Sequence, residues 1–193
     1  SGSLILSHDS GATWQQWVDN TPCPQSVLFH ETGAVYRTYS SAFSRSDPSD
    51  WSLWRGTNWY TIDGEPQQLV WMNLATFSSS GTTLYGYATY VDQHPVAQYY
   101  GGVFRSLDSG DTWERLVDAP SVRALERVDD HLIVGEASGA LSRLDLLTGD
   151  RQAIAKLAGQ VTAIDATGAA AGALLAATTA GVFRSQDGGR TWC

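Results

Sequence analysis

The stretch SHDSGATW occupies residues 7–14, and closely similar octapeptides occur at residues 106–113 (SLDSGDTW) and 185–192 (SQDGGRTW). All three copies follow the pattern Ser-x-Asp-x-Gly-x-Thr-Trp. The second and third copies are also preceded by the same tetrapeptide, Gly-Val-Phe-Arg, at residues 102–105 and 181–184. A pattern this long that recurs within one chain indicates an internal structural repeat.

Each residue type in the octapeptide suits a tight turn between two strands. Glycine permits a positive φ, and the aspartate carboxylate can accept hydrogen bonds from turn amides. The threonine hydroxyl can add further bonds, and the tryptophan ring can bury a large surface against the neighbouring repeat. We therefore interpret these residues as structural rather than catalytic. The set comprises Ser7, Asp9, Gly11, Thr13, Trp14, Ser106, Asp108, Gly110, Thr112, Trp113, Ser185, Asp187, Gly189, Thr191 and Trp192.

The octapeptide resembles the Asp-box, also called the BNR repeat, of sialidase-like β-propellers. The resemblance extends over nearly the whole chain at the level of the repeat. It implies an all-β fold, a β-propeller of four-stranded antiparallel blades in which each Asp-box is the turn between the third and fourth strands. Members with this repeat include glycosidases, receptors and assembly factors, so the motif specifies the fold far better than an activity.

Two degenerate copies complete the series. The five box aspartates, Asp9, Asp47, Asp108, Asp145 and Asp187, are separated by 38, 61, 37 and 42 residues. A period near forty residues suits a four-stranded blade, and the longest spacing leaves roughly twenty extra residues. We expect a single β-propeller domain over 1–193, with repeats at approximately 1–20, 21–56, 57–118, 119–155 and 156–193.

Short apolar or aromatic runs between turn residues predict the first three strands of each later repeat. No segment shows a convincing helical period. The expected strands are 27–30, 34–38 and 42–46; 69–75, 83–88 and 102–105; 122–125, 131–135 and 139–143; and 161–164, 173–178 and 181–184.

The first repeat begins at its third strand, and the last repeat stops just after its box. We therefore expect this chain to be part of a longer propeller, because an open arc leaves two sheet edges that missing residues, another chain or a further domain must cover. The alternative is a five-bladed ring with an unusual closure.

Composition limits the classes of partner. The net charge is −8, with 12 basic and 20 acidic residues, which argues against nucleic acid and anionic membranes. We expect no transmembrane segment, because the most apolar stretch, 163–180, contains Asp165 and several threonines. The two cysteines, Cys23 and Cys193, provide neither a disulfide framework nor a zinc site, and we expect no metal or cofactor.

The extra length of the third repeat falls at 56–67 and 89–101, which we expect to form neighbouring loops on the face opposite the boxes. Loops on a rigid scaffold often carry binding residues, and aromatic rings beside polar groups suit a sugar or a protein partner. The candidate binding residues are Trp59, Tyr60, Tyr90, His94, Tyr99 and Tyr100. The alternative is structural: Trp59 and Tyr60 cover the end of a blade, and the two adjacent tyrosines extend a strand.

The enzymes of this fold supply the rival hypotheses. Sialidases use an arginine triad, which the remaining arginines of this sequence do not assemble; the nearest string to their Arg-Ile-Pro motif contains Arg37 but lacks the Ile-Pro. Xyloglucanase-type glycosidases use two carboxylates across a cleft, and Asp63, Glu65 and Asp92 could supply carboxylates. We regard Asp63 and Asp92 as weak catalytic candidates and assign no catalytic residue.

The sequence therefore predicts a non-catalytic propeller that serves as a binding or scaffold module for a protein or a polysaccharide. The resemblance implies a setting outside the cytoplasm: secreted, periplasmic or on a bacterial cell surface. The alternatives are a fragment of a glycoside hydrolase and a structural subunit of a larger assembly.

Overall fold

The computed structural model describes the backbone of residues 4–7, 9–17, 26–29, 35–38, 43–46, 54–57, 59–62, 65–77, 82–92, 98–166 and 172–193. Side chains are described at 5, 7, 9–15, 27, 35–36, 82–88, 101–166 and 172–193. Every regular element within these ranges is a β-strand, so the expected all-β fold class is confirmed.

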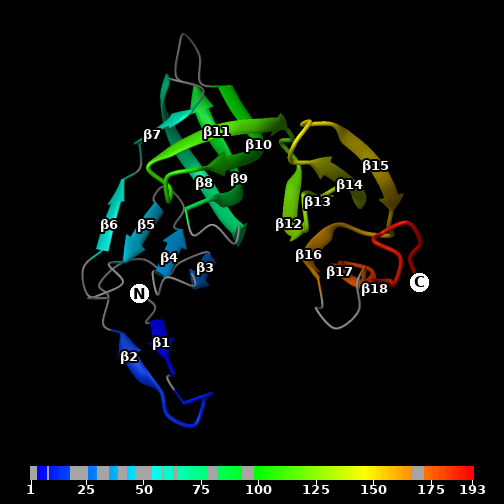
Figure 1. Cartoon of the computed structure of the whole chain (residues 1–193), viewed down its shortest axis with the longest axis horizontal. Coiled ribbons are helices and arrows are strands. Elements are labelled where there is room, and N and C mark those ends of the chain that lie inside the picture. The colour runs from blue at the N-terminus through cyan, green and yellow to red at the C-terminus, as the bar shows by residue number, and fades with distance from the viewer. Residues whose placement is uncertain are drawn as a thin grey trace.

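Residues 4–57 form two separate antiparallel sheets (Figure 1). The first sheet pairs β1 (Leu4–Leu6) with β2 (Gln15–Trp17), across the turn of the first octapeptide. The second sheet contains, in sequence order, β3 (Ser26–Phe29), β4 (Val35–Thr38), β5 (Phe43–Ser46) and β6 (Trp54–Thr57).

The third sheet departs from a four-stranded blade because it closes on itself. Its strands are β7 (Trp59–Ile62), β8 (Glu65–Phe77), β9 (Leu84–Asp92), β10 (Gln98–Ser106) and β11 (Thr112–Asp118). Neighbours in sequence pair antiparallel, and β11 then pairs parallel with β7, which closes a barrel.

This sheet corrects the prediction that 56–67 and 89–101 are loops. Within those ranges, residues 56–57, 59–62, 65–67, 89–92 and 98–101 belong to strands. The extra residues satisfy their backbone hydrogen bonds by adding β7 and lengthening three strands, instead of projecting as loops. The structural alternative for Tyr99 and Tyr100, that they extend a strand, is confirmed.

The last two sheets are more regular. One contains β12 (Val122–Val128), β13 (His131–Glu136), β14 (Ala140–Asp145) and β15 (Arg151–Lys156). The other contains β16 (Val161–Asp165), β17 (Leu174–Thr178) and β18 (Gly181–Ser185), and Cys193 exchanges two backbone hydrogen bonds with Arg184 along its edge. All the strands expected from sequence overlap strands of the structure, so those placements are confirmed.

The sheets follow one another around an arc (Figure 1). One strand of each of the last four sheets contacts a strand of the next: β3 contacts β8, β8 contacts β12, and β12 contacts β16. In Figure 1, β12 and β16 lie toward the inside of the arc. Consecutive sheets therefore pack against one another, with β3, β8, β12 and β16 along their common seam.

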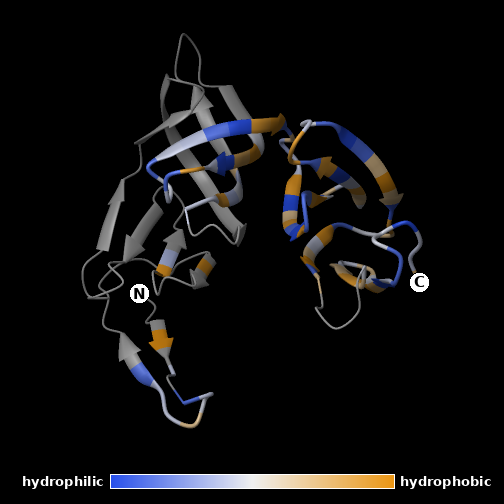
Figure 2. Cartoon of the chain, in the orientation of Figure 1, coloured by the Kyte–Doolittle hydropathy of each residue, from blue (hydrophilic) through white to orange (hydrophobic). Residues whose placement is uncertain are grey.

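The core lies between consecutive sheets, and the alternation of strand residues explains why. In β12–β15, Leu132 and Val134 pack toward β9 and β10, where they join Tyr85 and Val103. Ile133, between them in sequence, packs on the other face against the β16–β18 sheet. Figure 2 shows the resulting alternation of apolar and polar residues along these strands. Both faces of this sheet are buried, and each such aliphatic side chain contributes about 1.5–3 kcal/mol.

Candidate functional site

The three octapeptide turns share one hydrogen-bond network. In the second copy, the Asp108 carboxylate accepts bonds from the Thr112 amide at 2.8 Å, the Thr112 hydroxyl at 2.5 Å and the Ser106 hydroxyl at 2.8 Å. The Ser106 hydroxyl in turn accepts a bond from the Gly110 amide at 2.8 Å. The same bonds recur around Asp9 and Asp187. These carboxylates are thus occupied within their own turns.

The turn bonds stabilise the ionised carboxylates. Hydrogen bonds from the Thr13 and Thr191 hydroxyls, with further turn donors, lower the pKa of Asp9 and of Asp187 to about 2. Burial opposes ionisation of Asp108, but its bonds from Thr112 and Ser106 outweigh burial and lower its pKa. A permanently charged, internally bonded carboxylate is a poor proton donor, which fits the structural interpretation of the motif.

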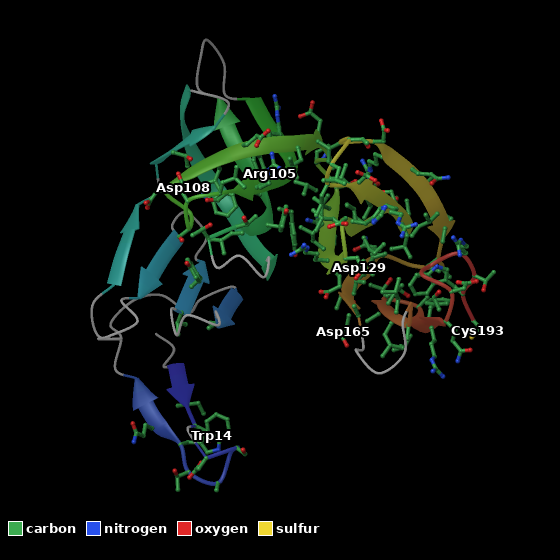
Figure 3. All side chains as sticks on the ribbon, in the orientation of Figure 1. Trp14, Arg105, Asp108, Asp129, Asp165 and Cys193 are labelled. Carbon is green, nitrogen blue, oxygen red and sulfur yellow. The ribbon has the colours of Figure 1, made fainter. Side chains whose placement is uncertain are left out.

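The tryptophans of the three turns differ in burial. Trp113 is only 3% exposed, and its indole Nε1 donates to the Gly110 carbonyl at 3.1 Å. Trp192 donates likewise to Gly189 at 2.9 Å and packs against the core between the last two sheets. Trp14 is 59% exposed, so the prediction that it is buried against a neighbouring repeat is wrong. It lies on the small β1–β2 sheet at one end of the arc (Figure 3), where the described residues leave it uncovered.

The predicted binding aromatics lie on three strands of the closed sheet, where the structure describes their backbone. Of these strands β9 and β10 are neighbours, whereas β8 on one side and β11 on the other separate β7 from them. Trp59 and Tyr60 belong to β7, Tyr90 to β9, and Tyr99 and Tyr100 to β10. Tyr90 pairs directly with Tyr100 across β9 and β10.

The register also relates Trp59 to Tyr99. Trp59 pairs with Gln68, Gln68 with Val91, and Val91 with Tyr99, so the two aromatics belong to one row across four strands. Along the curved sheet they are separated by three strand spacings, roughly 15 Å, and closure of the barrel makes the direct distance between their Cα atoms shorter. Of the other candidates, Asp92 ends β9 opposite Gln98, whereas His94 and Asp63 lie outside the described residues.

A second feature, which we call the inter-sheet pocket, lies between the third and fourth sheets. It is a cavity of about 240 Å³. Its lining residues are Arg105, Glu114, Arg115 and Leu116 from β10 and β11, and Leu144, Asp145, Leu146, Leu147, Thr148 and Gly149 from the end of β14 and the following turn. No sequence pattern indicated this pocket, and Arg105 stood out only as the last residue of the repeated tetrapeptide.

The polar wall of the pocket is built around Arg105. One terminal nitrogen of Arg105, Nη2, donates to Glu114 Oε2 at 2.7 Å, while its Nε is buried without a hydrogen-bond partner. Arg115 pairs with Asp118, also at 2.7 Å. The opposite wall is the degenerate fourth turn, where the Asp145 carboxylate accepts bonds from the Leu147 and Thr148 amides. The box aspartate therefore caps its turn even where the rest of the motif is lost.

A third feature is a carboxylate pair on the inner strands. Burial, and then the negative charge of Asp165, raise the pKa of Glu126 to about 7, although the Ala166 backbone opposes this with a hydrogen bond. Glu126 belongs to β12 and Asp165 ends β16, so the pair lies where two consecutive sheets meet. Sequence reasoning missed Glu126, because no local pattern distinguishes it from other strand glutamates.

The described residues hold no group of three or more His, Cys, Asp or Glu side chains arranged to bind a metal ion. Within the same residues, no helix is long and apolar enough to cross a membrane. Cys193 is an exposed free thiol, and Cys23 lies outside the described residues.

Comparison with known proteins identifies the fold. No protein-family model matches the chain, and no curated protein matches it significantly in sequence. Among solved structures, a GH74 enzyme from Niastella koreensis matches 99% of the chain with a TM-score of 0.64 and 17% identity. YCF48 bound to D1 peptide matches 98% of it with a TM-score of 0.59 and 18% identity. The GH74 xyloglucanase from Xanthomonas campestris matches 88% of it with a TM-score of 0.59 and 21% identity.

These similar structures are β-propellers, so the propeller-like fold is shown. The chain covers 28%, 59% and 30% of those three proteins, respectively. At such identities the likeness establishes the fold and leaves activity open.

Proposed function

We propose that this protein is an Asp-box propeller that binds an extended segment of a protein partner through the aromatic strands. We use that name for β7, β9 and β10 with Trp59, Tyr60, Tyr90, Tyr99 and Tyr100. The observation that carries the proposal is the strand register of one enlarged, closed sheet. In this register Tyr90 pairs with Tyr100 on neighbouring strands, and Trp59 shares a row with Tyr99.

Two further points support this proposal. Tyrosine and tryptophan are enriched among the residues that dominate binding energy at protein interfaces. One of the structurally similar propellers, YCF48, is seen bound to a D1 peptide, so this fold can present a peptide-binding surface. Strands also hold aromatic residues more rigidly than loops do, which reduces the entropy lost on binding.

The test begins with selection of linear peptides from a displayed random library on the immobilised chain. Affinities of the enriched peptides are then measured by calorimetry for the wild type and for Tyr100→Ala. We expect at least a tenfold loss, about 1.4 kcal/mol, as for a central interface tyrosine. Trp14→Ala, which removes an exposed tryptophan from the distant β1–β2 sheet, is the matched control and should change affinity less than twofold.

Failure to enrich any peptide, or equal affinities of wild type and Tyr100→Ala, would contradict the proposal. A polysaccharide array, probed in parallel, tests whether the ligand is a carbohydrate instead of a peptide. Binding to a glycan that Tyr100→Ala abolishes would keep the aromatic strands as the site and replace the peptide by a sugar.

The second candidate function is glycoside hydrolysis, which the Glu126–Asp165 pair specifically favours. A carboxyl with a pKa of about 7 retains its proton near neutrality and can serve as a general acid, while an ionised neighbour acts as base or nucleophile. The fold likeness to two GH74 enzymes agrees with this candidate at the level of the scaffold.

Release of reducing sugars from xyloglucan tests the enzyme hypothesis. Hydrolysis that is lost in Glu126→Gln but retained in Glu114→Gln would establish it. Loss in Asp63→Asn and Asp92→Asn instead would transfer the role to the pair expected from sequence. Absence of hydrolysis by the wild type would remove this candidate.

A further inference from the structure

We propose that the inter-sheet pocket is a binding site for a carboxylate carried on an aliphatic group, with Arg105 as its anchor. This site is independent of the aromatic strands. Arg105 lies at the end of β10 next to the octapeptide turn, whereas Tyr99 and Tyr100 lie near the opposite end of the same strand, roughly 16–20 Å away at the usual rise per residue.

The first argument is the incomplete hydrogen bonding of Arg105. A guanidinium carries five N–H donors, and the Nε of Arg105 is buried without a partner while Nη2 bonds Glu114. A buried N–H donor without a hydrogen-bond partner lowers the stability of the protein. A ligand acceptor that bonds to this donor therefore gains binding free energy. A carboxylate suits this fork because its two oxygens can accept from two adjacent N–H groups.

The second argument is that the carboxylate of a ligand can replace Glu114 as the partner of Arg105. Its side chain is 56% exposed, against 24% for Arg105. Ion pairs of this exposure contribute little to stability, because water and salt compete for both partners. Glu114 can therefore rotate into solvent and let the carboxylate of a ligand take its place on Arg105.

The third argument is the apolar wall. In the three complete octapeptides, the two residues after the aspartate are Ser-Gly, Ser-Gly and Gly-Gly, but after Asp145 they are Leu146 and Leu147. The turn needs neither leucine, because backbone amides supply its bonds to Asp145. Leu147 nevertheless remains 83% exposed at the rim of the pocket. An exposed leucine beside a charged wall suits a ligand that combines an aliphatic group with an anion.

The size and charge of the pocket limit the ligand further. A cavity of about 240 Å³ is below the usual range for drug-sized molecules, so it fits one or two side chains or a short acid. Arg105 and Arg115 are offset by Glu114 and Asp145 among the lining residues, and the Asp145 carboxylate is held by its turn. Displacement of Glu114 leaves the wall with one net positive charge for a single carboxylate.

The experiment uses the full chain and three probes: acetyl-Leu-Glu-Leu-amide, its neutral analogue acetyl-Leu-Gln-Leu-amide, and free 4-methylpentanoate. Two-dimensional NMR follows the Arg105 Nε–H signal and the amides of residues 147–149. We expect the acidic peptide to shift these signals and the neutral peptide to leave them in place. If 4-methylpentanoate shifts them as strongly, the carboxylate site is upheld and its natural ligand is a small acid.

The affinities of four variants for the acidic probe test the role of each pocket residue. Glu114→Gln should bind the acidic probe at least threefold more tightly, because the internal competitor is weakened. Arg105→Gln should abolish binding, Leu147→Ala should weaken it, and Arg190→Gln, an exposed arginine elsewhere, should have no effect. A merely structural arginine would not produce tighter binding on removal of its partner.

Equal shifts by the acidic and neutral peptides, unchanged affinity in Glu114→Gln, or no shift at millimolar probe would each overturn the proposal. The intrinsic tryptophan fluorescence and the melting temperature of each variant verify that it is folded. Binding at the pocket and binding at the aromatic strands are measured with different probes. Failure of one proposal therefore does not affect the test of the other.

Discussion

At the scale of single residues, Ser106 shows how much one hydroxyl contributes to the octapeptide turn. It is 1% exposed, accepts bonds from the Gly110 amide at 2.8 Å and the Asp108 amide at 3.3 Å, and donates to Asp108. Ser7 makes the same set of bonds in a turn that is open to solvent. Ser7 and Ser106 therefore make the same hydrogen bonds but differ in burial, so a comparison of their alanine variants shows the effect of burial alone.

We expect Ser106→Ala to lower the free energy of unfolding by about 1–3 kcal/mol, because it leaves the buried Gly110 amide without an acceptor. Ser7→Ala should cost less, since water can replace its hydroxyl. Urea denaturation measures both. Equal decreases in the free energy of unfolding of the two variants would show that burial does not change the contribution of this serine to stability.

The turn aspartates predict an acid-sensitive fold. Because the pKa of Asp9 and Asp187 falls to about 2 in the folded state from an ordinary 3.8, their contribution is complete well above pH 3.8 and is lost as the pH falls toward 2. Melting curves between pH 5 and roughly 2 should show this decline. In Asp187→Asn the decline should be shallower, and an unchanged profile would refute the assignment.

Glu126 predicts the opposite dependence. Its pKa is raised from 4.5 to about 7 in the folded state, so the folded protein holds this proton more tightly than the unfolded chain does. Glu126 therefore lowers stability progressively as the pH rises from about 4.5 to 7. Glu126→Gln should raise the melting temperature at pH 8 with little change at pH 4. A lower melting temperature at pH 8 would argue against an ionised, destabilising Glu126.

At the scale of elements, the packing of sheet on sheet depends on Gly135 in β13. A Cβ at this position would lie 2.6 Å from Val161 Cγ1 and 2.9 Å from Ile164 Cδ1, both on β16 of the next sheet. The absence of a side chain here allows β13 and β16, which belong to consecutive sheets, to approach closely.

Gly135→Ala should therefore destabilise the protein by about 1–3 kcal/mol through overpacking. The double variant with Val161→Ala should recover part of this loss, because it removes the methyl groups nearest the new side chain. Thermal denaturation of the four combinations gives the coupling energy. Strictly additive losses would mean that the two residues do not share a contact.

The strands of the regular sheets could be predicted from sequence, because each is a local apolar run between turn residues. The turn chemistry of Asp108 and Asp145 could be predicted for the same reason. The closed third sheet could not, because its closing contact pairs Thr112 with Thr61, far apart in sequence, and no local pattern reports such a register. The error at 56–67 and 89–101 arose from treating extra length as loop.

At the scale of the whole molecule, β3, β8, β12 and β16 contact one another in turn along the seam between consecutive sheets, so the sheets depend on their neighbours for burial. Trp113, in the second octapeptide, is buried, and Trp192, in the third, is partly buried. Trp14, in the first octapeptide at the other end of the arc, is 59% exposed. The same residue type in the same motif is thus buried only where a neighbouring sheet supplies a surface.

The candidate sites show a similar limit on sequence reasoning. The aromatic strands could be proposed from sequence because the residues are conspicuous, although their strand setting was missed. The inter-sheet pocket and the Glu126–Asp165 pair arise from contacts between sheets, and their residues look ordinary in the sequence. Arg105, for example, belongs to a repeated tetrapeptide and gains its unpartnered Nε only through packing.

Hydrogen–deuterium exchange of the chain, with and without a library-selected peptide, tests most directly whether the aromatic strands form the binding surface. The account predicts that the peptide slows exchange in residues 59–62 and 89–101 and leaves the β12–β15 sheet unchanged. Protection confined to other strands, with no change in those two segments, would contradict it.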